Sequence, residues 1–224
     1  MSIVEDMAIF TDYIAAALMY NLQILPESLM SGLVVLAVVL ANQALLAMAA
    51  GAAGTQLLTS AVGRIIMRMS GTADAVPVSS LDMCYTGFVG KAWNRFAGTT
   101  TELWHPRSPS VFMATVGFFV GYGMALQTLY KEEIDAKVVS RSSLTMTAVI
   151  SVLLLITALV FRIASGCESL LGAFGGTILG LMFGYLGCIA LGYATDRRAT
   201  NVWGIPLLRD RINNGSALYV CAKD

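Results

Sequence analysis

The sequence predicts an all-α integral membrane protein with four transmembrane helices. Hydrophobic residues make up 57% of the 224 residues and charged residues only 12%, whereas a soluble domain usually carries about 25% charged residues. The mean hydropathy is +0.72. The apolar residues lie in long blocks without a charged side chain, and about 20 such residues cross a hydrocarbon core of about 30 Å. Four blocks reach this length: Ser28–Gly63, Ser108–Tyr130, Ser142–Phe161 and Ser169–Thr195.

The N-terminal segment, residues 1–28, is expected to hold an interfacial or packed helix and no cleaved signal. Glu5 and Asp6 stand where a signal peptide carries positive charge. The first apolar block that follows is longer than one crossing needs but too short for two crossings and a turn. We therefore expect the first transmembrane helix over residues 29–54.

Residues 55–109 are expected to leave the bilayer. In the continuation of the first block, Arg64 and Arg68 lie on a different helix face from the apolar residues. Such a division into a basic and an apolar face is typical of a helix on the membrane surface. Gly, Ser, Thr and Pro are frequent after it, which indicates one long extramembrane loop. A three-helix transmembrane bundle is then predicted over residues 110–194, with helices at 110–130, 143–162 and 169–194.

Glycines recur at every fourth position of the last block, and the second block carries a shorter copy of this pattern. A glycine costs roughly 1 kcal/mol relative to alanine in a soluble helix, but small residues let helices approach closely in lipid. We predict that these two helices pack together as a glycine zipper, with the glycine-free helix 143–162 as a cover. The alternative is that the groove forms the seam or pore lining of a homo-oligomer. The glycines are Gly117, Gly121, Gly172, Gly176, Gly180 and Gly184.

Residues that could carry chemistry are scarce. Ionisable residues inside a membrane usually mark ion pathways or substrate sites, and the interiors of the four predicted helices lack them. Asn42 and Gln43 favour a hydrogen bond across helices over a transport site. His105, the only histidine, has no second His or nearby Cys to complete a metal site. No phosphate-binding or dinucleotide fingerprint occurs. We expect no enzyme activity, no cofactor, no metal and no nucleic-acid partner.

The charged segments predict contacts at the membrane surface. Glu133 and Lys137 are spaced as an i,i+4 pair in the connector between the second and third helices. The basic C-terminal tail, residues 195–224, begins with arginines that can meet anionic headgroups. Asn214-Gly215 predicts a small β-hairpin in this tail. The residues expected at the interface or against a partner are Trp104, Arg197, Arg198, Trp203, Arg209 and Arg211.

Charge and cysteine positions bear on topology. Eight basic residues against six favour the side that holds both termini as the cytosolic one. Cys84 and Cys167 fall together on the opposite side, where they could form a disulfide or remain two free thiols. Cys188 is expected to be a small buried side chain, and Cys221 to stay reduced in the cytosol.

Three stretches carry a resemblance to a known group of proteins. They are PSVFMATVGFFVGYGMALQTLYKEEIDAKVVSRSSL, FRIASGCESLLG and NVWGIPLLRDRINNGSALYVC. Over residues 109–221 the chain resembles uncharacterised multi-spanning membrane proteins of nucleocytoplasmic large DNA viruses. The resemblance implies a virion inner membrane or a host membrane derived from the endoplasmic reticulum, and contact with the capsid layer. It carries over no catalytic residue.

Two functions remain. The leading one is a structural protein of a viral inner membrane, which contacts capsid or other virion proteins through its loops and tail. The alternative is a small oligomeric channel or transporter-like protein. The two differ at Gly180, where added bulk would alter a conductance only in the channel.

Overall fold

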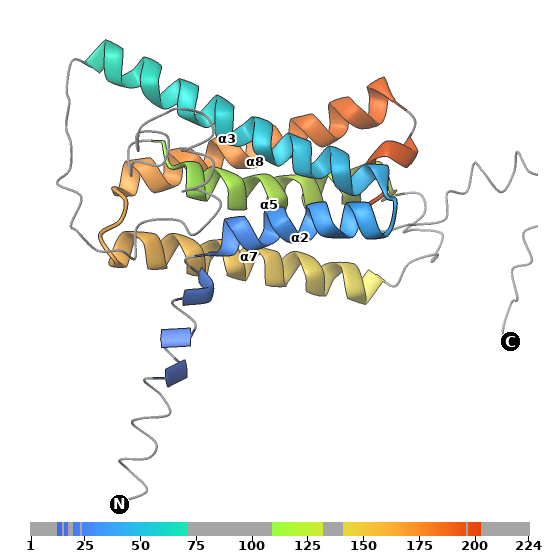
Figure 1. The fold of residues 1–224 in the computed structure, drawn as a ribbon, viewed down its shortest axis with the longest axis horizontal. Coiled ribbons are helices and arrows are strands. Elements are labelled where there is room, and N and C mark those ends of the chain that lie inside the picture. Colours follow the sequence, from blue (N-terminus) through green and yellow to red (C-terminus); the bar gives the residue numbers. More distant parts are fainter. Residues whose placement is uncertain are drawn as a thin grey trace, which may run out of the picture.

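The computed structural model describes residues 13–14, 16–17, 20–22, 24–70, 109–131, 141–195 and 197–202, and these residues form a bundle of helices (Figure 1). The elements are α2 (Leu25–Val39), α3 (Gln43–Ser70), α5 (Val111–Leu129), α7 (Arg141–Ala164), α8 (Leu170–Ala194) and the short 3-10 helix η3 (Arg197–Thr200). No strand occurs among the described residues. Among the described residues, four helices are long and apolar enough to cross a membrane, in agreement with the predicted number. Their spans are Gln43–Ile66, Val111–Leu129, Thr145–Ala164 and Leu170–Ala194.

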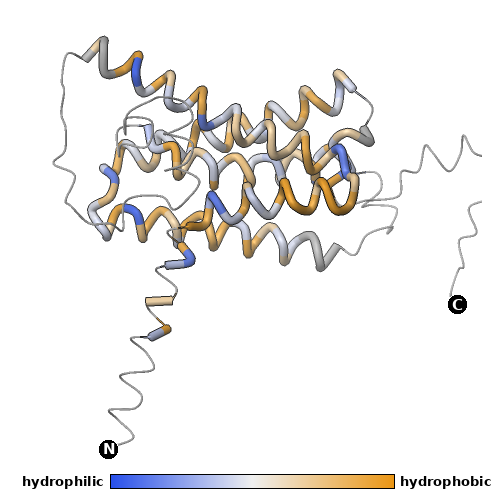
Figure 2. Tube along the Cα trace, viewed as in Figure 1, coloured by the Kyte–Doolittle hydropathy of each residue, from blue (hydrophilic) through white to orange (hydrophobic). Residues whose placement is uncertain are grey.

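Helix α5 lies at the centre of the bundle. Of its candidate span 72% is buried, against 11% for α7, and Figure 1 shows α5 surrounded by the other long helices. Its most extensive contact is with α8. Hydrophobic residues run along all the helices, whereas the most hydrophilic ones lie mainly toward the two ends of the bundle (Figure 2). The core is therefore built around α5, and the remaining helices expose their outer faces.

The first apolar block contains a helical hairpin, so the transmembrane helix expected over residues 29–54 is wrong. The turn between α2 and α3 lies inside that range. Asn42 begins α3 as an N-cap: its Oδ1 accepts hydrogen bonds from the backbone N–H of Ala44 (2.9 Å) and Leu45 (3.4 Å). Ala41 in the turn has a positive φ of 47°. The cross-helix role expected for Asn42 is thus replaced by a local one.

Helix α2 is apolar but short. Its 15 residues extend about 22 Å at about 1.5 Å per residue, less than the about 30 Å of a hydrocarbon core. It runs antiparallel to α3 (Figure 1). The chain therefore enters α2 at the end opposite to the α2–α3 turn. A count of four crossings no longer decides on which side of the membrane the N-terminus lies.

Helix α3 continues without a break to Ser70, so the separate surface helix expected from residue 55 onward is also wrong. The side chains of Thr55 and Thr59 are buried against the bundle. Gln56 Nε2 donates to Thr115 Oγ1 on α5 at 3.2 Å. The Gln56 hydrogen bond therefore joins this turn of α3 to α5, and the candidate span runs on to Ile66.

The other three helices agree with the predicted ranges within two residues at either end. Ser110 begins α5, and its side chain accepts a hydrogen bond from Met113 N at 3.0 Å. Ser169 begins α8 in the same way, accepting from Gly172 N at 3.1 Å. Serine is a favoured N-cap because its oxygen accepts from an unpaired N–H of the first turn.

Several sequence predictions lie outside the described residues. These are the long loop with its tryptophan and histidine, the Glu133–Lys137 pair and the tail hairpin. The residues concerned are Trp104, His105, Glu133, Lys137, Trp203, Arg209, Arg211, Asn214 and Gly215.

Candidate functional site

The predicted glycines lie where α5 and α8 meet. Gly176, Gly180 and Gly184 of α8 face the backbone carbonyl oxygens of Ser110, Ala114 and Phe118 on α5, and a Cβ built at any of the three would clash with them. On α5, a Cβ at Gly117 would lie 2.7 Å from Thr177 O, and one at Gly121 would lie 2.9 Å from Leu181 Cα. Real Cβ atoms essentially never come within 3.0 Å of such neighbours. The two backbones therefore touch directly.

The contact extends to the start of both helices. Gly172 is buried, and its carbonyl oxygen accepts a hydrogen bond from Ser110 N at 2.9 Å. The glycines of α5 thus face the backbone of α8, and the glycines of α8 face the backbone of α5. Within one copy of the chain, α5 occupies the groove on α8, so these two helices leave no channel between them.

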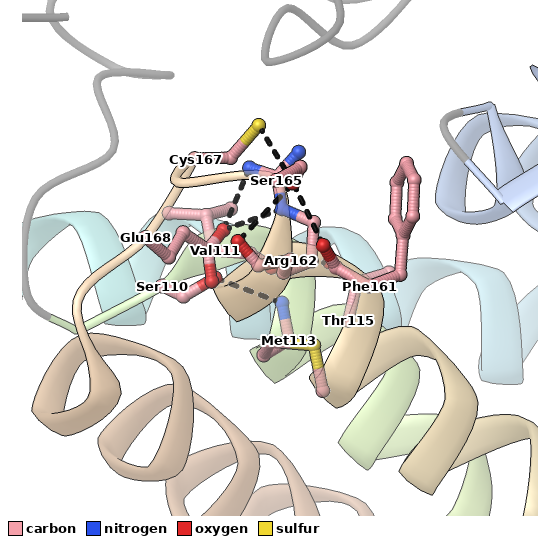
Figure 3. A network of polar contacts seen from close by, with 9 residues as sticks. All are labelled: Ser110, Val111, Met113, Thr115, Phe161, Arg162, Ser165, Cys167 and Glu168. Atoms are coloured by element: carbon pink, nitrogen blue, oxygen red, sulfur yellow. Dashed lines mark hydrogen bonds and ion pairs between the residues drawn. The ribbon is translucent and has the colours of Figure 1, made fainter. Parts of the chain in front are cut away.

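A structured turn joins α7 to α8 at one end of the bundle (Figure 3). Helix α7 ends at Ala164, and Gly166 adopts a φ of +69°. Gly166 N donates to Ile163 O at 3.0 Å, and Cys167 N donates to Arg162 O at 3.2 Å. This pair of bonds, with a left-handed glycine between them, is a Schellman motif. It fixes the direction in which the chain leaves α7.

A buried ion pair is held across this turn. Arg162 donates from Nε (3.0 Å) and Nη2 (2.7 Å) to Glu168 Oε1, and each side chain is 3% exposed. The Arg162 guanidinium also lies over the Phe112 ring of α5, with its Cζ 4.5 Å from the ring centroid. The pair therefore connects the α7–α8 turn to the central helix.

Helix dipoles favour the placement of both charges. Arg162 lies in the last turn of α7, where the unpaired carbonyl groups attract a cation. Glu168 directly precedes Ser169, the N-cap of α8, where the free N–H groups attract an anion. Arg162 Nη1 and Glu168 Oε2 are buried and make no hydrogen bond among the described residues.

Sequence reasoning missed this pair. The charge count used for topology includes Arg162 only as one of the six basic residues on the side opposite the termini. The available signal was an arginine at the end of one apolar block and a glutamate just before the next, separated by only the residues 163–167. A turn that short places the two side chains within reach of each other.

The same turn carries an oxidised cysteine. Cys167 is disulfide-bonded, and its partner lies outside the described residues. The Ser165 hydroxyl donates a hydrogen bond to Cys167 Sγ at 3.2 Å. Cys188 is a free thiol buried among α5 and α8 side chains, as expected from the sequence.

At the opposite end of the bundle, η3 is attached to α5. Tyr130 Oη and Thr200 Oγ1 share a hydrogen bond of 3.1 Å, and both side chains are fully buried. Arg197 and Arg198, predicted to meet headgroups, lie in η3 directly after the end of α8. Figure 1 shows η3 at the end of the bundle away from the α7–α8 turn.

Comparisons with known proteins add no family. No protein-family model, no curated protein and no solved structure matches the chain. Among the described residues, no group of three His, Cys, Asp or Glu side chains is placed to hold a metal ion. The resemblance to viral membrane proteins remains a prediction.

Proposed function

We propose that this chain is a structural integral membrane protein, whose bundle anchors its loop and tail at the two membrane surfaces for contact with other proteins. The resemblance described above implies the inner membrane of a large DNA virus as the setting. The observation that supports the proposal most directly is the backbone contact between α5 and α8, because a bundle closed at its centre favours anchoring over conduction.

The charges within the candidate spans support the same proposal. The four candidate spans of the described residues contain two Lys, Arg, Asp or Glu residues, which are Arg64 and Arg162. Arg64 is exposed near the end of its helix, and Arg162 is paired with Glu168 inside one turn. A proton or ion relay needs ionisable groups distributed across the membrane, whereas these two lie toward one end of the bundle.

The outer face of α7 is suited to lipid. Most of its exposed side chains are apolar, and they include Val149, Leu153, Ile156 and Val160. The hydroxyl of the exposed Thr157 donates to Leu153 O within the helix at 2.8 Å. Such a face needs no polar partner inside a bilayer, since its backbone groups are bonded within the helix. The described part of the chain therefore has the properties of a lipid-embedded anchor.

Conductance measurements separate the two candidate functions. Purified protein in planar bilayers should give no single-channel currents, with a pore-forming peptide in the same bilayers as the positive control. Reproducible currents that change in a Gly180→Leu variant would replace the structural proposal with the channel alternative.

Crosslinking mass spectrometry on intact particles or native membranes tests the anchoring role. Crosslinks should join residues of the 71–108 loop or of the tail to other proteins of the same membrane or of the capsid layer. Crosslinks confined to this chain and its own copies would contradict the proposal and favour a homo-oligomer.

A further inference from the structure

Few cysteines of this chain are available as the disulfide partner of Cys167. The chain has four cysteines, of which Cys188 is a free thiol. An intramolecular bond from Cys167 must therefore reach either Cys84, between α3 and α5, or Cys221, in the tail after η3.

The topology distinguishes these two partners. The chain segment that contains Cys84 is attached at both of its ends to the same end of the bundle as the α7–α8 turn. One attachment is Ser70, the end of α3, and the other is Ser110, the start of α5, whose N–H bonds to Gly172 O just after the turn. Figure 1 shows the end of α3, the start of α5 and the α7–α8 turn at one end of the bundle.

The segment that contains Cys221 starts from the other end. Helix α8 carries the chain away from Cys167 over 25 residues, which is about 37 Å at about 1.5 Å per residue. The hydrogen bond between Tyr130 and Thr200 then holds η3 at that far end. A bond between Cys167 and Cys221 would require the tail to return across the bilayer, where unpaired backbone groups are costly.

We propose that Cys167 is bonded to Cys84, and that this disulfide covalently joins the segment between α3 and α5 to the α7–α8 turn. The inference rests on the membrane crossing of α8 and not on the structural role proposed above. It also assigns the membrane orientation, because the Cys167 end must face the side on which thiols are oxidised and the tail must face the reducing side.

Bond formation is a two-electron oxidation. The Cys84 and Cys167 thiols each lose a proton, one S–S bond forms, and two electrons pass to a disulfide-bearing thiol oxidant, which is reduced to its dithiol.

Peptide mapping tests the pairing directly. The full-length protein in native membranes is alkylated before denaturation, digested without reduction and analysed by mass spectrometry. A linked peptide containing Cys84 and Cys167 should appear. It should persist in a Cys221→Ser variant and disappear in Cys84→Ser. A Cys167–Cys221 peptide, an intermolecular Cys167 bond or an alkylated Cys167 in the wild-type protein would each overturn the inference.

Thermal unfolding in detergent supplies a second measurement. Cys84→Ser, Cys167→Ser and the double variant should unfold at the same lowered temperature, and reduction should lower the wild-type protein to that temperature. Cys221→Ser is the matched control and should unfold with the wild type. A further decrease in the double variant relative to either single variant would show that the two cysteines do not share one bond. Neither experiment depends on whether the protein conducts ions.

Discussion

Gly180 allows the sharpest test of the α5–α8 contact. A Cβ at this position would lie 2.7 Å from the Ala114 carbonyl carbon and 2.8 Å from its Cα. Both neighbours are backbone atoms, so no side chain can rotate to make room. A Gly180→Ala variant must therefore push α8 away from α5, although it adds only one methyl group.

The size of the effect follows from the displacement. An ordinary van der Waals contact begins at 3.4 Å, so the two backbones must separate locally by at least about 0.7 Å, and by more at Ala114 O, which lies nearer still. A gap of about 0.5–1 Å already forfeits a quarter to a half of each dispersion contact. The loss extends to Gly176 and Gly184, which face the same helix one turn away on either side. We expect the free energy of unfolding to fall by about 1–3 kcal/mol, as in other overpacked cores.

Gly187 provides the matched control within the same helix. It has no atom within 4 Å of an added Cβ, so Gly187→Ala should be neutral or up to about 1 kcal/mol more stable, from helix propensity alone. Both variants are compared by titrating detergent-solubilised protein with SDS and following circular dichroism. If Gly180→Ala is no less stable than Gly187→Ala, α5 and α8 do not touch as described. Gly180→Leu should lose more than Gly180→Ala.

Two further predictions concern the α7–α8 turn and use the same titration. Arg162→Met leaves the Glu168 carboxylate buried without its partner and should cost about 3–5 kcal/mol, whereas adding Glu168→Leu should restore most of this loss; a double variant as unstable as Arg162→Met would contradict the pairing. Gly166→Ala places a side chain at a φ of +69° and should cost about 1–2 kcal/mol. Gly166→Asn should lose less, because asparagine tolerates this conformation better, and equal losses in the two variants would argue against the left-handed turn.

The sequence predicts the number of long apolar helices and three of their ranges because charge-free length is a strong and local signal. Ser110 and Ser169 begin two of these helices as N-caps, so the starts of both helices could be predicted closely as well. The spacing of the glycines also indicated which two helices carry flat faces, although close backbone contact depends on the rotation of both helices and had to come from the structure.

The first block shows why the rest could not be predicted in the same way. No charged residue occurs from Ser28 to Gly63, so the charge-free length contains no sign of the turn at Ala41 and Asn42. The only signal is one asparagine, which either caps a helix or bonds across helices, and its local hydrogen bonds to Ala44 and Leu45 decided between them. The Arg162–Glu168 pair was missed for a related reason, since charge counting treats each residue at a boundary as solvated.

The central position of α5 has a consequence for biosynthesis. Its main partner, α8, is the last long helix in the part of the chain that the structure describes. The roughly forty residues between α5 and α8 take about 2–8 s to synthesise at about 5–20 residues per second. Until α8 has been made and inserted, the surface formed by Gly117 and Gly121 lacks the helix against which it packs. The ribosome therefore delivers the whole chain through α8 before the core can close, and a product truncated before Leu170 would retain an unfinished central helix that membrane quality control can recognise.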